Sequence, residues 1–497
     1  MRQNKWFRRA AGLTLACASI VSAAPLGGSV APVVSAQAAI DAGGEFHALT
    51  PTRILDTRSP SINDVAPLGA KASVPNPTTS SAGEFDFAPL AVGLEGLPTD
   101  ADDVLAIVAN VTVTQPGQGG WVAVYPKGFE FGGADGNGQV SSLVNFEANT
   151  SVPNMAVVGL GDDGMITING FSNPGSSYHI LIDILGFIST SSYDEGGARL
   201  EVVAPGRLLD TRTTSAIGPG QSRNLPMRGA DTVADATGTA VTKDIVPDDE
   251  DVTAVLINLT LVNDGPGAQL THATATPDKL SANAGGSTPS TSNATPGLIK
   301  ANTTIVPIND DGSISLYNNS GNLHLVVDVL GYFEEGADPG TNRGRVVPLD
   351  APFRAFDTRE AAFNDTQLQH GSEETWSFDD FVNSVVLNPG ADNQVEGPPQ
   401  QALIGNLTAV ELEPLFPSQA GTVQSSFLKL TPADAEPAEV SNVNFFLGDV
   451  VPNTSLVKYG VGFDKEGTKT GDHVVKAYNN YGQIDYLLDV FAIVLDD

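Results

Sequence analysis

Short apolar runs rich in Val, Ile, Leu and Thr recur along the chain between clusters of Gly, Pro, Asn and Asp. Such runs are typical of β-strands. Asp163-Gly164 and Asp311-Gly312 stand between runs and predict hairpin turns. Residues 111–113 alternate with Thr, which predicts one solvent-facing side, whereas residues 180–188 are apolar on both faces and predict a covered central strand. No segment has a helical period, so the pattern predicts an all-β protein.

The same sequence blocks return three times, and a repeat of this kind governs the architecture. An Arg-x-x-Asp-Thr-Arg block is followed by an Asn-x-Thr run, a short block ending in Asn, and an apolar run with one internal carboxylate. The copies of the first block are residues 51–58, 205–212 and 352–359; those of the second are 106–113, 254–261 and 402–409; those of the third are 152–154, 300–302 and 451–453; and those of the fourth are 180–187, 325–332 and 486–491.

The repeats predict three tandem modules, at residues 44–190, 199–335 and 345–497. The joins between them are short and polar, as linkers usually are. For all-β modules of this size, two antiparallel sheets packed as a β-sandwich or jelly roll are the natural solution. The pattern alone does not separate a sandwich from a barrel.

Residues 1–38 have the features of a secretory signal peptide: a basic start, an apolar run at 10–24, and an Ala36-Gln37-Ala38 cleavage site. We therefore expect a secreted protein. The single cysteine, Cys17, falls in this leader, so the mature chain would lack disulfides. No later stretch is apolar over the ~18 residues that a membrane span needs.

The net charge is −33 at pH 7, from 58 acidic and 25 basic residues. A field of this sign repels nucleic acid and favours neutral or cationic partners. We therefore expect no nucleic-acid partner.

Arg207-Leu208-Leu209-Asp210-Thr211-Arg212, the Asn-x-Thr run and Asp328-Val329-Leu330-Gly331-Tyr332-Phe333 together resemble a repeat of exported actinobacterial proteins. The resemblance covers essentially the whole mature chain. It implies a cell-envelope-associated accessory module, which often accompanies cell-wall hydrolases, and it carries over no catalytic residue. Module three departs most, with Phe353 and Ala355 in its first block, Gly405 in its second, and no Gly-Tyr-Phe ending.

The lone carboxylate in each closing strand lies in so apolar a run that it must be paired or protonated. We expect the last arginine of each first block to pair with it. The predicted pairs are Arg58–Asp183, Arg212–Asp328 and Arg359–Asp489. The alternative is a ligand site, because arginine binds carboxylates, phosphates and sugars directionally. The other charged residues of the motif are Arg53, Asp56, Arg207, Asp210, Arg354 and Asp357.

Asn110, Asn258 and Asn406 stand in mid-strand, where Asn is disfavoured. We expect each to cap a neighbouring loop or bulge, with a glycosylation acceptor as the alternative. Trp121 and Tyr125 share one face of a predicted strand; they either pack in the core or contact a glycan.

Catalysis and metal binding have weak support. The six histidines, residues 47, 179, 272, 324, 370 and 473, do not recur at matching repeat positions. Acid clusters at 100–103 and 248–251 could bind Ca²⁺, although solvated turn acids are the expectation. No other cofactor is predicted.

These observations predict an exported, non-enzymatic envelope or extracellular repeat protein that binds cell-wall glycan, glycolipid or another surface protein. Two alternatives remain open. One is a cell-wall hydrolase with one diverged active module, and the other is a structural surface-layer or spacer subunit. The sequence does not predict an oligomeric state.

Overall fold

The structure is a computed structural model that describes residues 43–58, 74–75, 83–129, 141–172, 176–233, 241–280, 289–338, 340–360, 363, 366–387, 395–413, 425–435 and 440–497. The predicted signal peptide and Cys17 lie outside these residues.

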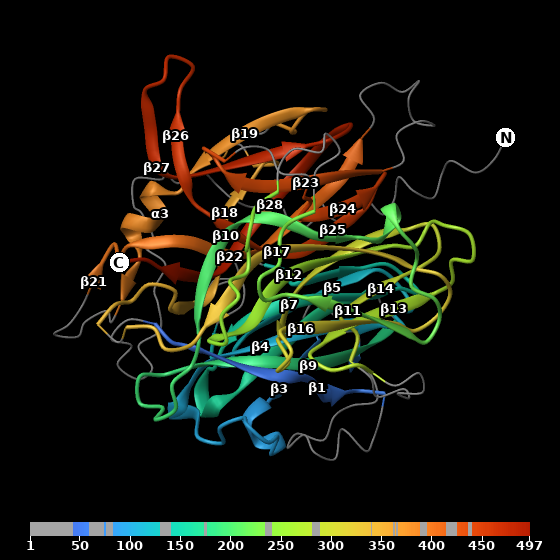
Figure 1. Cartoon of the computed structure of the whole chain (residues 1–497), viewed down its shortest axis with the longest axis horizontal. Coiled ribbons are helices and arrows are strands. Elements are labelled where there is room, and N and C mark those ends of the chain that lie inside the picture. The colour runs from blue at the N-terminus through green and yellow to red at the C-terminus, as the bar shows by residue number, and fades with distance from the viewer. Residues whose placement is uncertain are drawn as a thin grey trace.

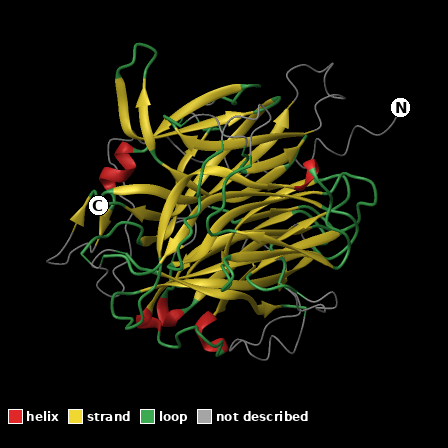
Figure 2. Cartoon of the chain, in the orientation of Figure 1, coloured by secondary structure: helices red, strands yellow, loops and turns green. Residues whose placement is uncertain are grey.

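Each module consists of two antiparallel sheets, which we call the inner and the outer sheet (Figures 1 and 2). In module one the inner sheet has the order β1-β9-β4-β7 and the outer sheet the order β3-β8-β5-β6. The bounds are β1 Phe46–Asp56, β2 Val74–Pro75, β3 Gly83–Phe87, β4 Val104–Thr114, β5 Gly120–Pro126, β6 Val144–Phe146, β7 Ser151–Gly159, β8 Ile166–Ser172 and β9 Ser177–Ser189.

Modules two and three repeat this order strand for strand. The inner sheets are β10-β17-β12-β15 and β18-β28-β22-β25, and the outer sheets are β11-β16-β13-β14 and β19-β27-β23-β24. The bounds in module two are β10 Arg199–Asp210, β11 Gln221–Pro226, β12 Val252–Val262, β13 Thr271–Thr276, β14 Ser292–Ala294, β15 Ile299–Pro307, β16 Ser313–Asn318 and β17 His324–Glu334. Those in module three are β18 Val346–Asp357, β19 Ser372–Ser377, β20 Val386–Leu387, β21 Val395–Glu396, β22 Gln400–Glu413, β23 Ser425–Pro432, β24 Val443–Phe446, β25 Val450–Lys458, β26 Gly460–Phe463, β27 Lys469–Asn479 and β28 Gln483–Leu495.

This strand order is that of an eight-stranded jelly roll. The prediction of an all-β chain of three sandwich or jelly-roll modules is therefore confirmed. Helix is confined to short pieces, of which α3 (Asp379–Ser384) is the α-helical one among the described residues. No helix in this part of the chain is long and apolar enough to cross a bilayer.

The prediction that the Asp-Gly turns at 163–164 and 311–312 form hairpins is wrong, because the strands on either side of each turn do not pair. Asp163 and Gly164 do form a tight turn, with φ of 59° and 68°. That turn leads from β7 of the inner sheet to β8 of the outer sheet, and the Asp311-Gly312 turn likewise leads from β15 to β16. Local turn chemistry marks a chain reversal, but it does not say which strands pair.

The strand at residues 180–188 is covered on both faces, as predicted. Ile182 and Ile184 face the core inside module one, whereas Leu185 and Ile188 belong to a second apolar cluster. That cluster takes residues from all three modules, and we call it the shared core. The predicted wet face of residues 111–113 is wrong, because every residue of β4 is buried and Thr112 is 3% exposed. The polar side of β4 faces another module instead of water.

The three modules form a closed ring in which each module contacts the other two. The edge strands β7, β15 and β25 contact one another pairwise. The first residues of the modules also join: Gly44 bridges to Val346, Phe46 bridges to Ala198, and the Leu200 amide donates to the Gly344 carbonyl at 2.9 Å. Module one therefore touches module three directly, and the modules do not stand in a row.

Module three carries an addition to this plan. Strand β26 pairs with the first half of β27, and the resulting hairpin projects from the body at the upper left of Figure 1. Phe463 lies on this hairpin and is 60% exposed.

Because both faces of an inner sheet are packed, truncation on either face should destabilise the protein. We expect Met155→Ala in the shared core and Ile182→Ala inside module one each to lower the free energy of unfolding by about 2–5 kcal/mol. Leu270→Ala, at a side chain that is 69% exposed, is the control and should have an effect within about 0.5 kcal/mol. Urea unfolding measures all three. A near-neutral Met155→Ala would mean that the inner sheets face solvent.

Candidate functional site

One row of polar side chains crosses each inner sheet, and we call it the polar row. In module one it consists of Arg53, Asp183 and Asn110, which are paired in register across β1, β9 and β4. The matching rows are Arg207, Asp328 and Asn258 in module two and Arg354, Asp489 and Asn406 in module three. The aspartates and asparagines of all three rows are 1–2% exposed. The row places a charged pair and an amide in the buried interior of each module.

The carboxylate of each row is paired with an arginine, but not with the predicted one. Arg53 donates from Nε and Nη2 to the two oxygens of Asp183 at 2.7 and 2.9 Å. The Arg207–Asp328 and Arg354–Asp489 pairs have the same two-pronged geometry. The predicted partners Arg58, Arg212 and Arg359 are wrong. Strand register places the first arginine opposite the carboxylate, whereas the last arginine lies beyond the end of the strand.

The last arginine instead turns back onto the aspartate of its own motif. Arg58 donates to both oxygens of Asp56 at 2.9 and 2.8 Å, and the Arg53 guanidinium lies 3.6 Å from the same carboxylate. Arg212 contacts Asp210, and Arg359 contacts Asp357, in the same way. Each motif thus forms a chain of alternating charge that runs from the buried Asp183 position to the half-exposed Arg58 position.

Burial raises the pKa of these carboxylates, whereas hydrogen bonds from the arginines lower it. Desolvation raises the pKa of Asp183 above its usual value, and the bonds from Arg53 offset only part of that rise. Asp56 is also partly desolvated, but the hydrogen bonds from Arg58 outweigh this and hold its pKa below the usual range. The buried end of the chain therefore depends on its arginine to stay ionised.

The threonine of the motif fixes the turn after the strand. The Thr57 hydroxyl accepts from the Ile180 amide at 3.0 Å and contacts the His179 ring nitrogen at 3.1 Å. Thr211 makes the same contacts with Leu325 and His324. The prediction that no histidine recurs is therefore wrong, because His179 and His324 occupy matching positions. In module three Asp485 replaces them and accepts from the Thr358 hydroxyl at 2.9 Å.

The asparagine of each row caps a loop, and the loop belongs to the next module. The Asn110 side-chain amide donates to the Ser290 carbonyl of module two at 2.7 Å. Asn258 donates to Ser441 of module three at 2.5 Å, and Asn406 donates to Ser142 of module one at 2.6 Å. The direction of bonding is cyclic, so these contacts close the ring. Because each amide is buried, none is presented to solvent as a glycosylation acceptor.

A second asparagine completes each junction. Asn302 donates to the Asn110 side-chain oxygen at 3.0 Å and to the carbonyl of Thr291 in its own module at 2.6 Å. Asn453 and Asn154 do the same toward Asn258 and Asn406. Sequence reasoning assigned these residues no role, although their recurrence in the third block was a signal that could have found them.

The two candidate glycan-contact aromatics differ in accessibility. Tyr125 is 2% exposed, and its hydroxyl accepts from Asn169 at 3.0 Å. Burial raises its pKa to about 12. Trp121 is half-buried, and its ring lies 6.5 Å from that of Phe171 at an interplanar angle of 24°. Of the predicted pair, Trp121 alone remains a candidate contact for a sugar.

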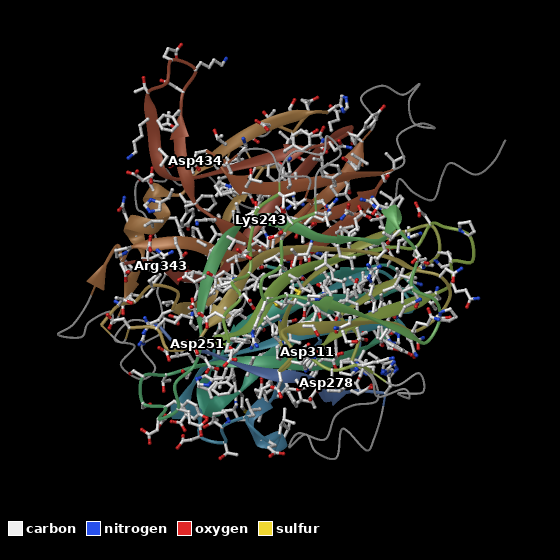
Figure 3. The ribbon with its side chains drawn as sticks, in the orientation of Figure 1. Lys243, Asp251, Asp278, Asp311, Arg343 and Asp434 are labelled. Carbon is white, nitrogen blue, oxygen red and sulfur yellow. The ribbon has the colours of Figure 1, made fainter. Side chains whose placement is uncertain are left out.

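The predicted acidic loops act as turn caps. Asp100 accepts from the Asp102 amide, and Asp249 accepts from the Asp251 amide, both at 3.0 Å. Across the described ranges, no three His, Cys, Asp or Glu side chains converge on a point where a metal ion would bind. Exposed acids such as Asp251, Asp278, Asp311 and Asp434 are spread over the body (Figure 3).

Module three contains one aspartate–histidine pair. The His473 ring nitrogen Nδ1 lies 2.8 Å from Asp379 Oδ1, and the same oxygen accepts from the His473 amide at 3.0 Å. The Ser377 hydroxyl bonds to this carboxylate and not to the imidazole. A serine nucleophile would need the opposite order, with the imidazole between serine and carboxylate. The pair anchors the base of the β26–β27 hairpin.

A small cavity lies between modules one and three, lined by Ser141, Leu143, Pro352, Asn406 and Phe491 among others. Its volume is about 20 Å³. This is room for about one water molecule, so a sugar ring does not fit.

Comparison with known proteins does not assign the chain to a family. No family model and no curated protein matches it. Among solved structures, the tandem CBM22 domain of Paenibacillus barcinonensis Xyn10C matches at 14% identity over 46% of this chain and 78% of that chain, with a TM-score of 0.13. An archaeal-virus structure titled as a triple jelly roll matches at 9% identity over 96% and 98%, with a TM-score of 0.15. These scores are too low to support an inference about fold or function.

The two arginines of one motif should differ sharply in their effect on stability. Arg207→Gln leaves Asp328 buried without its partner, and we expect the free energy of unfolding to fall by about 3–5 kcal/mol. Arg212 is 47% exposed, so Arg212→Gln should cost less than about 1 kcal/mol. Urea denaturation of the two variants measures the difference. Equal losses would contradict the assigned pairing.

Proposed function

We propose that this chain is an exported, non-enzymatic protein of the cell envelope or extracellular space that binds cell-wall glycan. The carrying observation is where the repeated polar residues lie. The arginine, aspartate and asparagine of every polar row are engaged in pairing within a module or in docking the next module. The repeated residues thus stabilise the scaffold, and we assign binding to surface residues that are not repeated.

Module one offers such a feature in the Trp121–Phe171 pair on its outer sheet. Both rings are half-buried, so each keeps one part in contact with solvent. Aromatic rings present a rigid apolar face to which the C–H face of a sugar can pack. A net charge of −33 favours a neutral polymer over an anionic one. These properties support a neutral glycan more than a phosphate-rich polymer.

A matched pair of substitutions tests the site. Trp121 pairs with Asn145 on β6, and Phe427 occupies the same position in module three, paired with Asn444. We expect residues 39–497 to be retained saturably on isolated actinobacterial cell wall and on its glycan fraction. Trp121→Ala should weaken retention at least about tenfold, the order of one lost aromatic contact. Phe427→Ala should leave retention unchanged.

The same tubes distinguish the alternatives. Release of soluble sugar that is abolished by Asp379→Asn would make the chain a hydrolase acting through module three. Retention on the protein or lipid fraction alone would replace glycan as the ligand. Failure to bind any fraction, together with concentration-dependent assembly, would leave a structural layer or spacer.

A further inference from the structure

One position on the outer sheets, beside the short edge strand that contacts the neighbouring module, is occupied by a different ring in each module. It is the outer-sheet residue that pairs with the asparagine of the Asn-x-Phe or matching block. The residues are Trp121, His272 and Phe427, paired with Asn145, Asn293 and Asn444. Two of the three rings cannot gain a charge in water near neutral pH. The third, His272, can.

His272 belongs to module two and pairs with Asn293 of β14, the strand that contacts β7 of module one. Arg53 of β1 is near enough for its positive charge to oppose protonation of the ring. The Tyr317 ring of β16 lies 6.4 Å away. Nε2 of His272 is buried and makes no hydrogen bond. Among the described residues, Arg53 and Tyr317 are the charged or titratable groups that face the imidazole, and Asp183 and Asp56 lie behind Arg53 and are engaged by it.

A second half-buried histidine lies where modules one and two meet. His47 of β1 stacks on Phe187, with ring centroids 4.6 Å apart, and meets the edge of Tyr193 at 5.0 Å. Its Nε2 is also buried without a partner, and it lies next to Gly197 at the start of module two. Glu45 and Glu195 face this ring and favour its protonation, which opposes the effect of burial. The surroundings of His47 therefore oppose protonation less consistently than those of His272 do.

We propose that the junction between modules one and two is an acid-sensitive latch, in which protonation of His272 beside Arg53 releases module one from module two. The other two modules have no imidazole at this position, because it is Trp121 in module one and Phe427 in module three, so acid adds no charge there. The ring then opens at one defined place, which exposes the shared core beside β1 and β15 and leaves the chain continuous through residues 190–198. This inference does not rest on the proposed glycan binding.

The direction of the pH effect follows from the two states. Burial, and then the charge of Arg53, lower the pKa of His272 to about 4 in the closed junction. In an open junction the ring meets water, and its pKa returns toward about 6.5. The latch is therefore fully closed above about pH 6.5 and weakens as pH falls toward 4. Each pH unit in that window shifts the equilibrium toward the open form by about tenfold.

Hydrogen exchange on the intact chain tests the latch. Backbone protection is compared at pH 7 and pH 4.5, after correction for intrinsic exchange rates. We expect loss of protection in β13, β14 and the facing part of β1, and unchanged protection at the two other junctions. His272→Phe, which installs the module-three residue, should abolish the loss.

The reciprocal variant keeps the test decisive. Phe427→His places an imidazole beside β24, the outer-sheet edge strand of module three that contacts β15 of module two. It should create acid-dependent loss of protection in β23 and β24. Burial raises the pKa of both Asp183 and Asp328, so their protonation would weaken two junctions alike and would persist in His272→Phe. Equal loss at all junctions, an unchanged response in His272→Phe, or no new response in Phe427→His would each overturn the latch.

Discussion

The buried arginine–aspartate pair in the middle of each apolar inner sheet is the interaction on which the rest of the structure depends. A carboxylate such as Asp328, fully removed from water, is tolerable only beside a charge that satisfies both of its oxygens. That requirement fixes the register of the first strand against the last. It also aligns the neighbouring asparagine of the central strand with a loop of the next module. The apolar shared core supplies the attraction between modules, and the polar row sets their order and orientation.

The ring explains how a chain whose only cysteine lies at position 17 can be compact outside that segment without disulfides. Each inner sheet is buried on both faces. One face packs against the outer sheet of the same module, and the other packs against the neighbouring modules. Both faces of the central strands therefore bury apolar surface, the dominant favourable term in folding. Module three keeps the polar row but replaces a histidine by Asp485 and adds the β26–β27 hairpin. Module three therefore keeps the residues that close the ring and differs at positions whose contacts lie within module three.

Much of the fold could be predicted because buried strands are rich in apolar residues. The apolar run at 180–188 predicted a covered strand, and the three repeats predicted three similar units. The errors have one physical origin, which is that sequence patterns describe a residue's environment but not its partner. Thr112 is buried on the side of β4 from which Asn110 bonds to module two, and the sequence pattern cannot distinguish that surface from one that faces water. A register shift between Arg53 and Leu55 sets Arg53, and not Ile54, opposite Asp183, and the residues of the motif do not indicate such a shift. Asn154, Asn302 and Asn453 each join a loop of their own module to the asparagine of a neighbouring module, so a module considered alone shows only half of their role.

Contacts between modules, and not the linkers, hold the ring together. Protease sites placed within residues 191–196 and 335–341 would allow both joins to be cut in the folded protein. We expect the three pieces to elute together at the mass of the uncut chain. The module-three piece should dissociate only when both of its polar junctions are broken, by Asn406→Ala combined with Asn258→Ala. Separation of the pieces immediately after cleavage of the unsubstituted protein would contradict it.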